Sequence, residues 1–74
     1  MWLVNITCSE EAWKQNAIEF KAMTQKYQCE VITSKKMTDG TRIMAYKLED
    51  VSDAENFQTE CTNFAGFTSD FESL

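Results

Sequence analysis

A β-hairpin is the feature of this sequence that most restricts its fold. Two runs of strand-forming residues, within 31–48, flank Thr38, Asp39 and Gly40. Asp-Gly supplies the positive φ angles of a tight primed turn, so we expect Asp39 and Gly40 to be the central residues of a two-residue turn. This turn sets the register of the hairpin and decides which side chains face the core. A slip of one residue would exchange the two faces.

The register that follows from this turn aligns Thr33 with Tyr46 and Val31 with Leu48. The face that holds these four residues is the more apolar one, and we expect it to contact the helices. The opposite face, which we expect to point outward, carries Ile32, Ser34, Lys36, Ile43, Ala45 and Lys47.

A strand followed by an amphipathic helix precedes the hairpin. Within residues 1–8, apolar and polar side chains alternate as in a strand, and the apolar face is expected to point to the core. Apolar residues then recur at helical spacing from residue 10 to about residue 27. Both Thr7 and Ser9 are suitable N-caps, and either places the start of the helix here.

A second amphipathic helix follows the hairpin. Ser52 and Glu55 form a capping box at its start, and Gly66 is well placed as its C-terminal residue. Residues 67–74 are either a short edge strand or a frayed tail. With that strand, the order of elements predicts one α+β domain over residues 1–74, the ferredoxin-like split βαβ, with two helices on one face of an antiparallel sheet. Without it, the sheet has three strands.

The charge of −5 is concentrated in the second half of the chain. Up to Thr38, five Lys against four Glu give +1, whereas the remainder has eight acids against Arg42 and Lys47, which gives −6. Such a surface repels phosphates, so we expect no nucleic-acid partner and find a basic protein easier to accommodate. RNA-binding domains of this architecture also need stacking aromatics on the open sheet face, and none is expected there.

The sequence lacks the commonest general acid and base of enzymes, and it has no glycine-rich loop that could bind phosphate. The chain has no His, and its only glycines, Gly40 and Gly66, are already explained by a turn and a helix end. Its acidic residues are too loosely spaced for a calcium loop. We therefore expect neither an enzyme nor a bound metal or cofactor.

The three cysteines, Cys8, Cys29 and Cys61, are odd in number and far apart. This pattern favours a reduced, cytoplasmic protein. Since no apolar run approaches the ~20 residues of a membrane helix, we expect no membrane partner. Cys8 is the one candidate reactive thiol, because a helix start can lower a thiol pKa. The competing interpretation, a structural thiol at the edge of the core, is favoured.

Two surfaces are candidates for binding a partner. The first is the sheet face expected to be open, which comprises Leu3, Asn5, Ile32, Ser34, Lys36, Ile43, Ala45 and Lys47. The second is the acidic second helix, which has no Lys or Arg nearby in sequence and comprises Glu49, Asp50, Asp53, Glu55 and Glu60. Solvation alone is the simpler explanation for such a charge run.

These features favour a small acidic regulatory protein, adaptor or inhibitor that acts through protein contacts. Its partner is expected to be another protein, a basic one if the acidic helix is used. Homodimerisation is the simplest use of an uncovered, partly apolar sheet face. The alternative function is a small-molecule-sensing ferredoxin-like module that binds its ligand at a homodimer interface.

Overall fold

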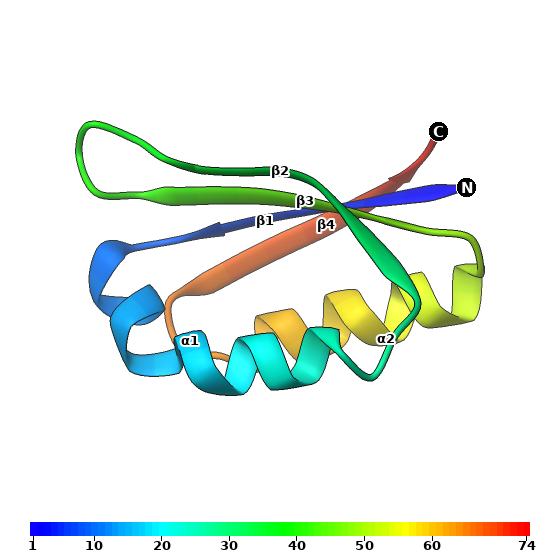
Figure 1. Ribbon diagram of the computed structural model, residues 1–74, viewed down its shortest axis with the longest axis horizontal. Coiled ribbons are helices and arrows are strands. Elements are labelled where there is room, and N and C mark those ends of the chain that lie inside the picture. The colour runs from blue at the N-terminus through cyan, green and yellow to red at the C-terminus, as the bar shows by residue number, and fades with distance from the viewer.

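In the computed structural model, which describes residues 1–74, a four-stranded sheet lies against two helices (Figure 1). In chain order the elements are β1 (Trp2–Cys8), α1 (Glu10–Thr24), β2 (Cys29–Lys36), β3 (Arg42–Leu48), α2 (Val51–Thr62) and β4 (Phe67–Ser73). The strand order is β2-β3-β1-β4, and every neighbouring pair is antiparallel. Both helices cover the same face, and the other face is open.

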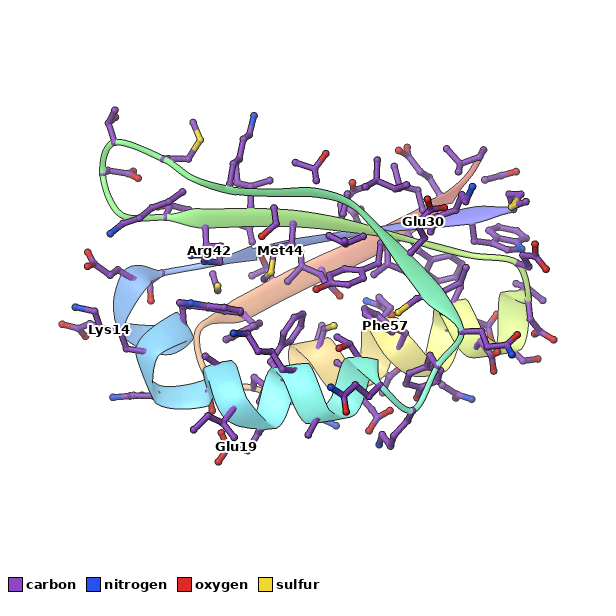
Figure 2. The ribbon with its side chains drawn as sticks, in the orientation of Figure 1. Lys14, Glu19, Glu30, Arg42, Met44 and Phe57 are labelled. Carbon is purple, nitrogen blue, oxygen red and sulfur yellow. The ribbon has the colours of Figure 1, made fainter.

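Strand β1 lies in the interior of the sheet, between β3 and β4. Its predicted alternation is confirmed, since Val4, Ile6 and Cys8 are buried on the face toward the helices. The sheet pairs Ile6 with Met44 of β3. Met44 and Phe57 of α2 point into the layer between sheet and helices (Figure 2).

Helix α1 uses the second of the two expected caps. The Ser9 side chain accepts a hydrogen bond from the Ala12 amide at 3.1 Å, so the helix begins at Glu10. It ends at Thr24, about three residues earlier than expected, because the chain turns there toward β2.

Helix α2 begins two residues earlier than its predicted capping box. The Asp50 carboxylate accepts hydrogen bonds from the amides of Ser52 and Asp53, at 2.7 and 3.3 Å. Asp50 is therefore the N-cap, and the assignment of that role to Ser52 was wrong. A carboxylate one residue before the first helical position meets the free amides before the Ser52 hydroxyl can, because Ser52 already lies within the first turn.

Residues 67–73 form a full strand, so the three-stranded alternative is excluded. Strand β4 pairs with β1 along its whole length and is tied to α2 by two hydrogen bonds. The Gln58 side-chain amide donates to the Ser69 carbonyl, and the Ser69 hydroxyl donates to the Gln58 carbonyl, both at 3.1 Å. Gly66, with φ of 82°, allows the chain to enter β4 beside α1, where a Cβ would lie 2.7 Å from that of Ala12.

The hairpin turn is longer than predicted. Within the turn only Gly40 has a positive φ, of 92°, and its amide donates to the Met37 carbonyl at 3.0 Å. The Met37 amide in turn donates to the Thr41 carbonyl at 2.7 Å. The loop therefore holds three residues, Thr38 to Gly40, as in a type I turn followed by a left-handed residue. Asp39 keeps a negative φ and accepts a hydrogen bond from the Thr41 amide at 2.9 Å.

The predicted hairpin register was consequently wrong. Strand β2 pairs Ser34 with Met44 and Thr33 with Ala45, one residue away from the expected register, and a bulge at Ile32 adds a second shift. Because β3 is also paired with β1, its own faces are unchanged, and the whole shift falls on β2. In the paired part of β2, it is Glu30, Thr33 and Lys35 that lie on the open face, opposite Lys47, Ala45 and Ile43.

Aromatic rings fill the centre of the core. Phe20 of α1 is fully buried, and its ring lies within 5.6 to 6.2 Å, between centroids, of four other rings. These rings belong to Trp13, Tyr46, Phe64 and Phe67. No helix has the length and the apolar content needed to cross a membrane.

Candidate functional site

An open pocket of about 530 Å³ lies where α2 begins beside the start of β2. We call it the acidic pocket, and it is lined by Gln28, Cys29, Glu30, Lys47, Glu49, Asp50 and Asp53. Three of the predicted acidic residues are among them. The fourth carboxylate of the pocket belongs to Glu30, which lies on β2 (Figure 2) and was not a predicted site residue.

Sheet pairing brings these residues together. Cys29, the first residue of β2, pairs with Leu48, the last residue of β3. Glu30 therefore lies close to the two acidic residues that lead from β3 into α2, Glu49 and Asp50. A hairpin with the predicted register would have placed Val31 opposite Leu48 instead, so this neighbourhood follows from the bulge and the longer turn.

The pocket holds four carboxylates and one ammonium group. The Lys47 ammonium lies 3.2 Å from the Glu30 carboxylate, and Asp50 is engaged as the cap of α2. Glu49 is exposed and Asp53 is half-buried, and neither carboxylate has an ion-pair partner. The result is a concave surface with an excess of negative charge, which attracts cationic groups.

These side chains are not arranged as a metal centre. No group of three or more His, Cys, Asp or Glu side chains in the chain lies close enough to hold an ion.

The other two acidic candidates lie outside this pocket. Glu55 is exposed on α2. Glu60 binds the ammonium of Lys26 at 2.5 Å and the hydroxyl of Tyr27, and these two partners hold the pKa of its carboxyl below its usual range. Glu60 thus joins the turn that follows α1 to α2. Its partners are more than thirty residues away in sequence, so its neighbours in the sequence do not predict these contacts.

The open sheet face brings together five of its eight predicted residues, namely Leu3, Asn5, Ile43, Ala45 and Lys47. It is less apolar than expected. Ala45 is only 7% exposed, and the Asn5 amide donates a hydrogen bond to the Asp70 carboxylate at 3.1 Å. Because Lys47 also pairs with Glu30, the polar side chains of this face are largely engaged by contacts within the sheet.

The remaining three residues, Ile32, Ser34 and Lys36, were placed on this face by the wrong register. Ser34 and Lys36 lie on the same side as the helices, near the hairpin end. The Ser34 hydroxyl accepts a hydrogen bond from Arg42, and the Lys36 ammonium lies 3.6 Å from the Glu10 carboxylate. Ile32 occupies the bulge at the edge of the sheet.

Cys8 is the candidate reactive thiol, and it is 2% exposed. Its burial raises the pKa of the thiol, and the nearby Arg42 charge offsets this only in part. Burial also raises the pKa of Cys29, and that of Cys61 to about 12. All three thiols are free and remain protonated at neutral pH, a state that favours packing over nucleophilic chemistry.

No protein-family model, no curated protein and no solved structure matches the chain.

Proposed function

We propose that the protein is a small non-enzymatic regulator or adaptor that binds a basic segment of a partner protein at the acidic pocket. The observation that carries this proposal is the convergence of four carboxylates from two separate parts of the chain around one concave surface. A single positive side chain, Lys47, offsets them, and it is already paired.

Electrostatics explains why a cationic segment fits. At this surface each unpaired carboxylate repels its neighbours, and a guanidinium or ammonium group entering between them removes that repulsion. A volume of about 530 Å³ is within the range of binding sites and accommodates one long basic side chain with part of its backbone. Such contacts mainly speed association and select the partner by its charge.

The proposal extends to the class of fold and the compartment. We infer that the fold is the ferredoxin-like split βαβ, which the strand order β2-β3-β1-β4 and the two helices on one face support. We also infer a cytoplasmic location, which the three free cysteines support, since thiols persist in a reducing compartment.

The experiment is a titration of the protein with a short capped peptide of alternating Arg and Gly, followed by amide chemical shifts. The expected result is a set of shifts centred on residues 28–30 and 47–53. The double variant Glu49→Lys with Asp53→Lys should weaken binding by about tenfold or more, since each charge reversal costs about 1 kcal/mol at a surface. Asp50 is left intact because it caps α2.

The matched control is Glu11→Lys with Glu19→Lys, which makes the same change of net charge on exposed positions of α1. It should bind the peptide nearly as well as the unchanged protein. If both double variants weakened peptide binding equally, net charge would explain the effect, and the acidic pocket would not be the binding site.

A further inference from the structure

The edge strand β2 carries a concentration of exposed apolar side chains. Val31 and Ile32 are 54% and 51% exposed, and Met37, directly after the strand, is also exposed. The other large exposed apolar residues are Met1 and Leu74, next to the chain ends, and Ile18 and Val51, which are isolated on helices. Exposed apolar side chains on neighbouring positions of an edge strand, as at Val31 and Ile32, are typical of a contact site.

Strand β2 also has one unpaired side. It is hydrogen-bonded only to β3, so its outer backbone groups and the side chains at the edge face solvent. An edge strand of this kind is a template for a second chain.

Charges along β2 are self-complementary. Glu30, which also contacts Lys47 within its own copy, precedes the apolar pair, and Lys35, which has no ion-pair partner within its own copy, follows it. When a second copy runs antiparallel to the strand, about a two-fold axis between Ile32 and Thr33, Glu30 comes opposite Lys35 of the second copy. Symmetry makes this ion pair twice and places each Ile32 opposite Thr33 of the second copy, beside the axis.

From these observations we propose that a second copy of this chain binds along β2, antiparallel to it, through Val31 and Ile32 with flanking pairs between Glu30 and Lys35. The bulge at Ile32 interrupts the alternation of free amides and carbonyls along the edge, so side chains rather than a continuous ladder carry the association.

The dimer is expected to be weak. Eight strand residues span roughly 26 Å, and an edge contact of that length remains below the roughly 1,200 Å² of a stable interface. The net charge of −5 on each copy opposes association further. Dimerisation therefore sets in only at high protein concentration, where two copies would place the acidic pockets at opposite ends of one joined edge.

The experiment is analytical ultracentrifugation from about 20 µM to about 1 mM, the range for weak contacts, with a reductant present to keep Cys29 from forming disulfides. The expected result is an average mass that rises from the monomer's 8.5 kDa toward twice that value. Ile32→Lys should shift the midpoint at least about tenfold upward in concentration, because it buries a charge at the axis.

Ile18→Lys is the matched control, since Ile18 is 84% exposed on α1, away from β2, and its replacement should leave the midpoint unchanged. Lys35→Glu should weaken the dimer, and Glu30→Lys added to it should restore association. A monomer at every concentration, equal effects of the two isoleucine variants, or no restoration by the charge exchange would each overturn the proposal.

The two proposals can fail separately. The Glu49 and Asp53 variants leave β2 unchanged and test only peptide binding. Ile32→Lys leaves the carboxylates of the acidic pocket unchanged and tests only self-association.

Discussion

Glu60 has a different role in the structure from the one that its neighbours in the sequence suggest. In sequence it belongs to an acidic run, whereas in the fold each of its carboxylate oxygens has a partner in the turn that follows α1. Oε1 binds the Lys26 ammonium and Oε2 accepts the Tyr27 hydroxyl. Burial and, after it, the hydrogen bond to Glu60 raise the pKa of the Tyr27 hydroxyl to about 12. The residue therefore links α2 to the turn after α1 and is not part of a free acidic surface.

Replacing Glu60 by Gln should lower the free energy of unfolding at pH 7 by about 1 kcal/mol, because a charged acceptor is lost. The contacts lower the pKa of Glu60 in the folded state, so their contribution is present above the unfolded-state pKa and is lost as the pH falls through the lower folded-state value. Urea unfolding at pH 7 and near pH 3 measures the difference between the two proteins, which should shrink in acid.

Glu55→Gln is the control for this prediction, since Glu55 is exposed on the same helix and makes none of these contacts. Its unfolding free energy should change by less than about 0.5 kcal/mol at either pH. A Glu60→Gln effect that stays the same at both pH values would contradict the assignment of the stabilisation to the ionised carboxylate.

At the scale of the elements, the sequence predicted which segments are strands and helices but not their exact limits. Alternation in β1 and helical spacing in α1 are long patterns, and both were found as expected. The start of α2 depended on a single choice between neighbouring polar residues. The capping-box pattern gave the N-cap role to Ser52, but Asp50 holds it in the structure. Both residues lie just before the same apolar stripe, so the pattern alone does not distinguish them.

Replacing Asp50 by Ala should destabilise the protein by about 1 kcal/mol, the usual cost of losing an N-cap. Ser52→Ala should have almost no effect, because its hydroxyl caps nothing in α2. Urea unfolding of both variants at neutral pH measures the two changes. A larger loss of stability in Ser52→Ala than in the Asp50 variant would show that Ser52 is the N-cap.

The hairpin register could not be read from the turn sequence, for a physical reason. Asp-Gly fits a two-residue turn with two left-handed residues, and it equally fits a three-residue loop in which only Gly40 is left-handed. The alternation of side chains in the sequence of β2 does not predict the bulge at Ile32. Since the neighbourhood of Glu30 depends on both, the acidic pocket was only partly predictable, whereas Ile43 and Ala45 were placed correctly through the pairing of β3 with β1.

At the scale of the whole molecule, stability depends on one apolar layer between the helices and a single face of the sheet. No polar or charged side chain is fully buried there, and the aromatic rings around Phe20 occupy its centre. A chain of 74 residues buries a smaller fraction of its surface than a larger domain does, so little free energy is held in reserve.

Replacing Phe20 by Ala should cost about 3–5 kcal/mol, comparable with the entire stability of a domain at the low end of the usual 5–15 kcal/mol. The variant should be largely unfolded at 37 °C by circular dichroism. Phe20→Leu, which keeps most of the volume, should stay folded with a lower melting temperature. An Ala variant that melts close to the unchanged protein would show that the layer repacks without this ring.

The interior position of β1 also determines the order in which the sheet can be completed. Its neighbour β4 is some 65 residues away along the chain, as the contact between Asn5 and Asp70 shows, whereas β2 and β3 are joined by a short turn. Closing a loop of that length costs entropy before any pairing is gained. The hairpin should therefore form early and the β1–β4 pair late. Until β4 pairs with β1, one edge of β1 and the apolar side of α2 stay exposed and can form non-native contacts with other chains.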